Sequence, residues 1–159
     1  MSRMLFSLVT LAIAASPAWA ETMKMKIDGK DWAATVVNSA TLSLPGGPVI
    51  TMTGKMEGEK TSALSLQLAP ASDDLKGHYE LKSGVPKKGN GGGNFNIDLL
   101  GGDPMADSLR FQSGTLDVTV YDTAAHTLSG TFSGVVVSHD GAKKMTIENG
   151  VLDSIAVGP

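Results

Sequence analysis

Methionine and histidine are the side chains in this sequence with the most distinctive chemistry. Eight methionines are present, two of them before residue 20, together with three histidines and no cysteine. Thioether sulfur and imidazole nitrogen are soft ligands that select copper, above all Cu(I). The candidate metal ligands are the two methionines in expected turns and the three histidines: Met56, Met105, His78, His126 and His139. The remaining methionines alternate with polar residues, a pattern typical of core side chains that fill gaps.

The residues that support nucleophilic or acid–base catalysis elsewhere form no recognisable motif here. The chain lacks Gly-x-Ser-x-Gly, and Ser133 falls within the alternation of an expected strand. General acid–base catalysis needs two carboxyl groups that converge on a cleft. The acidic pairs instead fall in expected turns, where carboxylates are solvated or cap the chain: Asp73 with Asp74, Glu57 with Glu59, and Asp28 with Asp31. We therefore expect a protein that is not an enzyme, and we assign no catalytic or cofactor-binding residue.

Two further segments fall short of the ligand-binding motifs that they resemble. Asp103 and Asp107 are four residues apart, too sparse for a calcium loop, and Asp103 is expected to cap a short helix at Pro104–Leu109. The other short-helix candidate is Ser72–Leu75. In Gly84–Asn94 the lysines precede the glycines, whereas a phosphate-binding loop needs Gly-Lys-Ser/Thr leading into a helix. We expect Gly84–Asn94 to be a mobile surface loop, so that replacing Lys87–Gly93 by a short Asn-Gly turn leaves thermal stability nearly unchanged.

The first 20 residues have the features of a secretory signal peptide. Arg3 provides a short positive region, Met4–Ala15 is apolar, and Ala18-Trp19-Ala20 places small residues at the positions that a signal peptidase reads. The apolar run is short for a transmembrane anchor, and no cysteine is available for a lipid anchor. We expect a periplasmic or extracellular protein with residues 1–20 as signal peptide and residues 21–159 as one secreted domain.

Composition excludes several classes of partner, and it excludes stabilisation by disulfides. The chain has 13 Lys and Arg against 16 Asp and Glu; without Arg3 the balance is 12 − 16 = −4. Nucleic acids and anionic membranes need basic patches, so neither is an expected partner. With no cysteine, the domain has no disulfides and depends on its core. Two kinds of partner are compatible with the composition, a protein and a small molecule.

Apolar residues alternate with polar ones along most of the expected domain. Examples are Met23–Ile27, Leu64–Leu68, Phe95–Leu99 and Leu116–Val120. A period of two is typical of half-buried strands in antiparallel sheets. The sequence predicts a single all-β domain of roughly nine to eleven short strands, an antiparallel sandwich or a flattened barrel. Trp32 and Phe132 are expected in its core.

Turn residues separate these strands. Asp28-Gly29 predicts a short hairpin, and Pro45-Gly46-Gly47-Pro48 separates two further strands. Asn149-Gly150 suits a type I′ turn, so Lys144–Asn149 and Val151–Val157 are expected to form the closing hairpin. Tyr79 and Tyr121 are expected as amphipathic rims.

Two segments resemble a known family. Ile27–Ala34 contains Gly-Lys-x-Trp, and the C-terminal part contains Ser-Gly-Thr-Phe at 129–132 followed by Ile147-Glu-Asn-Gly-Val-Leu-Asp-Ser-Ile155. Together they resemble uncharacterised secreted bacterial proteins, many of them lipoproteins. The resemblance covers the two ends and not residues 40–121, and Leu152 replaces a usual aromatic residue. It implies an all-β secreted domain, and it implies no catalytic residues.

These observations favour a secreted, non-catalytic binding or structural module. Three alternatives remain: a periplasmic copper-binding protein that uses Met and His, a carrier of a small lipophilic ligand, and an enzyme of unknown chemistry. A lipophile carrier requires a barrel with a hollow interior.

The signal peptide leads to the first testable prediction. We expect signal peptidase to cleave after Ala20, because small residues flank the site behind an apolar run. Mass spectrometry of the exported protein should find Glu21 as the N-terminal residue. Membrane-bound protein that retains Met1 would contradict this expectation.

Overall fold

The computed structural model describes residues 21–158, and all regular secondary structure among them is β-strand. The strands are β1 (Thr22–Ile27), β2 (Lys30–Ala33), β3 (Val36–Leu44), β4 (Gly47–Met56), β5 (Ser62–Ala69), β6 (Gly77–Lys82), β7 (Asn90–Asn96), β8 (Ser108–Asp122), β9 (Thr127–Ser138) and β10 (Lys144–Ala156). The expected all-β class is confirmed. Within residues 21–158 no helix has the length and apolar character needed to cross a membrane. The expected signal peptide lies outside the described residues.

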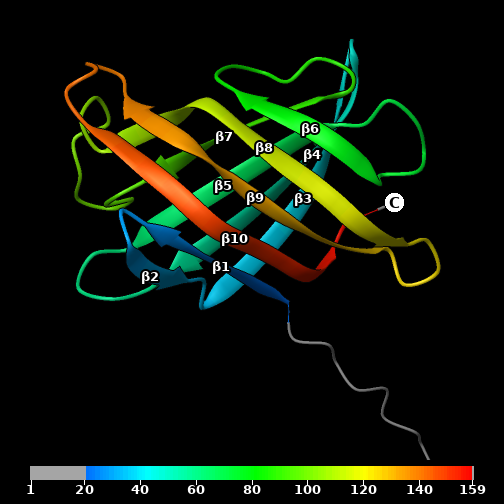
Figure 1. Ribbon diagram of the computed structural model, residues 1–159, viewed down its shortest axis with the longest axis horizontal. Helices are drawn as coiled ribbons and strands as arrows, with labels where there is room; N and C mark the ends of the chain where they lie inside the picture. Colours follow the sequence, from blue (N-terminus) through cyan, green and yellow to red (C-terminus); the bar gives the residue numbers. More distant parts are fainter. Residues whose placement is uncertain (1–20, 159) are drawn as a thin grey trace, which may run out of the picture.

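The ten strands form one sheet in the order β2-β1-β10-β9-β8-β6-β7-β5-β4-β3. Neighbouring strands are antiparallel except β6 and β7, which run parallel where Leu81 is opposite Gly91. In Figure 1, β8, β9 and β10 cross in front of β3, β4 and β5, so the sheet curls over on itself as a half-barrel. The first strand pairs with the last, with Thr22 opposite Asp153 and Ile27 opposite Ile147.

Bulges in the long strands produce this curl. The inward-facing residues of β10 are Ile147, Gly150, Leu152 and Ile155, so the spacing is three, two and three residues. The register with β9 shifts in the two intervals of three. An extra residue in one strand bends it and increases its twist. β8 has two similar shifts against β9, between Phe111 and Ser113 and between Val118 and Val120.

The predicted closing hairpin at Asn149-Gly150 is therefore wrong. Asn149 has a φ of 51°, as a turn would need, but the chain continues as one strand through it. A β-carbon on Gly150 would lie 2.5 Å from Cδ2 of Phe132 on β9. Gly150 is thus required by the close approach of an aromatic ring rather than by a reversal of the chain.

The glycine-rich segment forms β7, so the prediction of a mobile loop over Gly84–Asn94 is wrong for its second half. Gly91 and Gly92 are buried between β5 and β6. Gly93 has a φ of 155°, and a β-carbon there would lie 2.2 Å from the backbone oxygen of Ser65. Glycine is used here because it lets β7 approach its neighbours closely. Replacing Lys87–Gly93 by a turn would remove the middle of the sheet.

The core fills the space between the two crossed halves of the sheet. Trp32 and Phe132 are both buried, as the alternation predicted, and so are Met23, Met25 and Met52. The largest fully buried side chains are Phe111, Met23, Met52, Leu64, Leu66, Leu68, Leu81, Leu109, Leu116, Leu128, Ile147 and Leu152. Side chains of this size pack the interior as they do in small barrels.

The Trp32 side chain has a polar partner within this core. Its indole Nε1–H donates to Ser62 Oγ at 2.8 Å. Its ring also meets Phe95 edge to face, with the ring centroids 6.1 Å apart. The hydrogen bond satisfies the one polar group of the indole, which would otherwise be costly to bury.

Hydrogen bonds outside the strand pairing connect the two edge regions of the curled sheet to other parts of the chain. On edge strand β3, the hydroxyls of Ser39 and Thr41 donate to the backbone oxygens of Ala156 and Gly158 at the C-terminal end. After β2, Thr35 N–H donates to the backbone oxygen of Lys55 on β4 at 2.7 Å. The first two contacts bring β3 close to the C-terminal segment, and the third ties the link between β2 and β3 to β4.

Neither predicted short helix forms. Ser72–Leu75 contains bends, and Pro104–Leu109 contains a turn that leads directly into β8. Asp103 does cap that turn, because its Oδ1 accepts from Met105 N–H at 2.9 Å. Both segments are too short to form a regular helix, and in the second a backbone bond from Asp107 N–H to the Asp103 oxygen at 2.7 Å acts together with the side-chain cap.

The close approach at Gly93 leads to a stability prediction. Gly93→Ala should destabilise the domain by more than about 1 kcal/mol, because the new methyl group would collide with a backbone oxygen of β5 in a φ region that L-residues rarely adopt. Chemical denaturation followed by Trp32 fluorescence would measure it.

Gly58→Ala provides the matched control. The nearest atom to a β-carbon there is the Lys60 oxygen at 3.8 Å. We expect this variant to have wild-type stability. Equal stability of the Gly93 and Gly58 variants would show that β7 is not packed between its neighbours.

Candidate functional site

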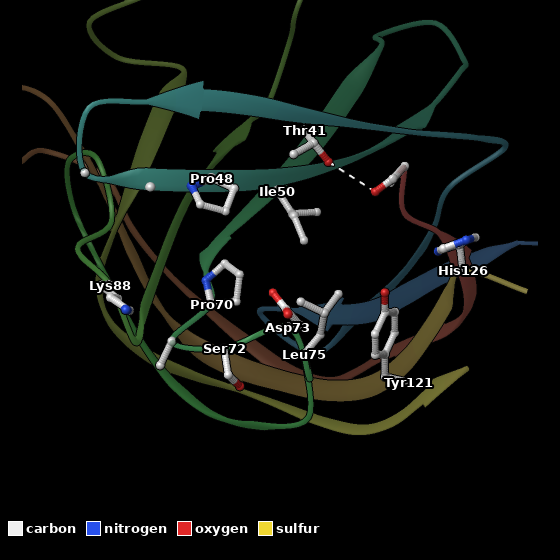
Figure 2. A pocket seen from close by; sticks show the side chains of 14 residues that line it. Thr41, Pro48, Ile50, Pro70, Ser72, Asp73, Leu75, Lys88, Tyr121 and His126 are labelled. Carbon is white, nitrogen blue, oxygen red and sulfur yellow. Dashed lines mark hydrogen bonds between the residues drawn. The ribbon is translucent and has the colours of Figure 1, made fainter. Parts of the chain in front are cut away.

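A hollow of about 380 Å³ lies at the open end of the half-barrel. We call it the mouth hollow. It is bounded by the β3–β4 turn, the segment between β5 and β6, the β8–β9 turn and the C-terminal segment. Figure 2 shows Ile50 and Leu75 facing each other across it, with the Tyr121 ring beside Leu75. Pro48 and Pro70 add further apolar surface. Ligand pockets are commonly about 300–1,000 Å³ in volume and mostly apolar.

The β8–β9 turn positions His126 at the mouth hollow. Asp122 Oδ1 accepts from the backbone N–H groups of Ala124 and Ala125, both at 2.9 Å. These two bonds, that from Ala125 first, lower the pKa of Asp122. His126 has a φ of 51°, and its backbone oxygen accepts from Val157 N–H at 2.8 Å. The turn is thus tied both to its own carboxylate and to the C-terminal segment.

The segment between β5 and β6 closes the floor of the mouth hollow. Leu75 is buried, and its backbone oxygen accepts from the Tyr79 hydroxyl at 2.8 Å. Burial, and secondarily the charge of Asp74, raise the pKa of Tyr79. Asp74 caps the end of the segment by accepting from Lys76 N–H at 3.0 Å. The buried Tyr79 side chain therefore holds this segment in place through its hydroxyl group. The prediction that Tyr79 forms an amphipathic rim is wrong.

Besides Thr41 and Ser72, four larger polar side chains surround this apolar floor. Tyr121 and His126 come from the β8–β9 hairpin, Asp73 from the segment before β6, and Lys88 from the segment before β7. Tyr121 is partly buried, as expected of an amphipathic rim, and the other three are exposed. The arrangement combines an apolar surface with hydrogen-bonding groups at its edge. It can therefore bind and orient a small molecule that has both apolar and polar parts.

The structure places the candidate metal ligands on different elements. His126 borders the mouth hollow, and His78 Nδ1 lies 2.6 Å from Asp117 Oδ1 on the outer face. Met56 ends β4 and is partly buried against the core. Met105 and His139 do come together, because His139 N–H donates to the backbone oxygen of Met105 at 3.1 Å. Within residues 21–158, no three His, Asp or Glu side chains are grouped to hold a metal ion.

Several carboxylates of the acidic pairs have structural partners. Asp28 Oδ1 accepts from Thr146 N–H at 2.8 Å, and Asp31 pairs with Lys26 at 2.8 Å. Asp107 pairs with Lys143 and also accepts from Asp103 N–H. The bond from Lys143, and then that from Asp103, lower the pKa of Asp107. These carboxylates hold turns together.

Sequence reasoning identified part of the mouth hollow. From the sequence alone, Tyr121 is expected as an amphipathic rim and His126 is a candidate ligand, and both line it. Asp73 is notable in the sequence only as one of an acidic pair, and Lys88 only as part of a loop. Ile50 and Leu75 carried no signal that separates them from other core residues. The sequence indicates the position of the mouth hollow only through the Pro45-Gly46-Gly47-Pro48 turn between β3 and β4.

Comparisons with known proteins identify no relative. No family model, no curated protein sequence and no solved structure matches the chain.

The β8–β9 turn leads to a prediction about pH. Asp122 has a lowered pKa in the folded state, so its stabilising effect is present above the unfolded pKa of about 3.9 and is lost as pH falls through the lower folded value. Asp122→Asn should therefore unfold at a lower temperature than wild type at pH 7. The difference should shrink progressively below about pH 4.

Thermal unfolding of both proteins between pH 7 and pH 2, about the range in which carboxylates titrate, would measure this difference. A difference that stays constant over the whole range would mean that the carboxylate charge does not stabilise the turn.

Proposed function

We propose that the chain is an exported, non-catalytic binding module that holds a small molecule in the mouth hollow. The observation that carries this proposal is the combination at one site of an apolar floor, Ile50 and Leu75, with polar groups on its rim. Binding sites for small molecules generally have this composition. The filled interior supports a site at the end of the sheet over a carrier with a ligand inside its barrel.

Export is supported by the sequence. The apolar segment before Glu21 and the small residues around Ala20 favour a cleaved signal peptide. We place the mature domain in the periplasm or outside the cell. The resemblance of its two ends to secreted bacterial proteins supports the same location. In this proposal the curled sheet acts as a flattened barrel. Its seam is the line along which Ser39 and Thr41 on β3 donate hydrogen bonds to the C-terminal segment.

A non-catalytic role is supported by the surroundings of the titratable groups. The histidines make two side-chain contacts among residues 21–158, His78 with Asp117 and His139 with Arg110. Neither is a contact with a serine or threonine hydroxyl, so neither forms the activated nucleophile of a hydrolase. Asp73, the one carboxylate of the mouth hollow, has no second carboxylate beside it there.

A fragment screen by nuclear magnetic resonance would test this proposal. We expect small molecules with an apolar ring and a hydrogen-bonding group to shift the resonances of Ile50, Leu75 and Tyr121. Tyr121→Ala should weaken the best binder about fivefold or more, because the ring forms a wall of the hollow.

Val120→Ala is the matched control. Val120 precedes Tyr121 on β8, is 54% exposed and faces outward. This variant should bind as wild type does. Fragments that bind equally well to the Tyr121 and Val120 variants would contradict a site in the mouth hollow.

A further inference from the structure

A second hollow of about 480 Å³ lies beside the β3–β4 turn. We call it the hairpin groove. It runs between that turn and the segment that joins β6 to β7, and it shares Gly46, Gly47 and Lys88 with the mouth hollow. Its volume falls within the usual range of about 300–1,000 Å³ for small-molecule sites.

The walls of the hairpin groove are apolar and open to solvent. Val49 is buried at its base, whereas Leu44 is 39% exposed and Val85 is 72% exposed. Pro86 continues the wall beside Val85. Large apolar side chains that gather at an open hollow mark surfaces that bury apolar ligands. The groove can therefore cover the hydrocarbon part of a ligand.

The charges that line the hairpin groove are all positive. Lys87 and Lys88 line it, and no aspartate or glutamate does. Among residues 21–158 neither lysine takes part in a salt bridge, whereas Lys26, Lys82 and Lys143 each pair with a carboxylate. Beyond the expected signal peptide the chain carries a net charge of 12 − 16 = −4, so a cationic site without an acid departs from its overall balance. Such a site complements an anion.

Backbone hydrogen bonds hold the two lysines beside the apolar walls. Gly89 N–H donates to the backbone oxygen of Ala69 at 2.7 Å, which ties the segment to the end of β5. Asn90 N–H donates to the backbone oxygen of Lys87 at 2.8 Å and closes a turn around Lys88. The backbone positions of the two lysines relative to the apolar walls are thus set before a ligand arrives, so binding does not have to order this segment of main chain.

We infer that the hairpin groove binds an anionic amphiphile of the medium-chain carboxylate type. The hydrocarbon chain lies against Leu44, Val49 and Val85, and the carboxylate meets Lys87 and Lys88. This inference rests on the proposed binding function, for which it names a class of ligand and a site adjacent to the mouth hollow.

Three probes that differ only in their head group test this inference: octanoate, octanol and octylamine. In titrations followed by nuclear magnetic resonance, octanoate should bind most tightly and octylamine most weakly. Lys88→Gln and Lys87→Gln should each weaken octanoate about twofold to fivefold, the effect of losing one exposed ion pair. Neither change should alter octanol binding. Added salt should weaken octanoate binding alone.

Two matched controls separate charge from apolar contact. Lys144→Gln removes an exposed lysine from β10, outside the groove, and should leave octanoate binding unchanged. Leu44→Ser should weaken both octanoate and octanol. Leu42→Ser should weaken neither, because Leu42 is equally apolar and exposed on the same strand but does not line the groove. All five lysine and leucine sites are exposed, so thermal unfolding should confirm intact folding in each variant.

Each contrary result identifies which idea fails. If octanol and octanoate bind the groove equally in wild type and in Lys88→Gln, the anionic class is wrong and binding stands. If octanoate shifts Tyr121 and Leu75 instead of Val49 and Val85, the groove assignment is wrong and the mouth hollow stands. If no probe binds at about 1 mM, a concentration that corresponds to the dissociation constant of a weak site, the inference fails. The fragment screen at Tyr121 then judges the proposed function independently.

Discussion

The extra residues in β8 and β10 are the constraint on which the rest of the structure depends. Each strand must keep its apolar side chains on one face while it carries more residues than its partner. The bulges meet both demands, with Asn149 and Ser154 in the left-handed region absorbing the surplus in β10. The resulting bends curl a sheet of ten strands until β3 meets the C-terminal segment. A flat sheet would have neither a seam nor a mouth.

The curl also determines where space for a ligand exists. The two halves of the sheet cross closely enough for side chains such as Phe111 and Leu66 to be fully buried between them. The two candidate sites lie instead at the β3–β4 turn and the segments opposite it. The mouth hollow and the hairpin groove lie on either side of this turn. The turn that completes the sheet's last hairpin is therefore also the wall between the two candidate sites.

The alternation of apolar and polar residues predicted the class, the strand content and core positions such as Trp32 and Phe132. It failed where local and distant interactions conflict. Asn149-Gly150 has the local preferences of a turn, yet the buried positions Ile147, Gly150 and Leu152 are spaced as in one bulged strand. The glycines of β7 have no side chains to show a period, and their burial depends on neighbours far away in the sequence. Lys88 depends on that same strand for its place, so its position was equally hidden.

The pairing of β1 with β10 has a consequence for when the sheet can be completed during folding. Strand Thr22–Ile27 directly follows the proposed cleavage site, and it lies between β2 and the last strand of the chain. The sheet cannot be completed until nearly the whole chain is available, and contacts between such distant segments form slowly. A newly made chain therefore stays open while its final strand is missing. This delay is compatible with the export proposed above, in which the chain passes through a narrow channel as an extended thread and assembles on the far side.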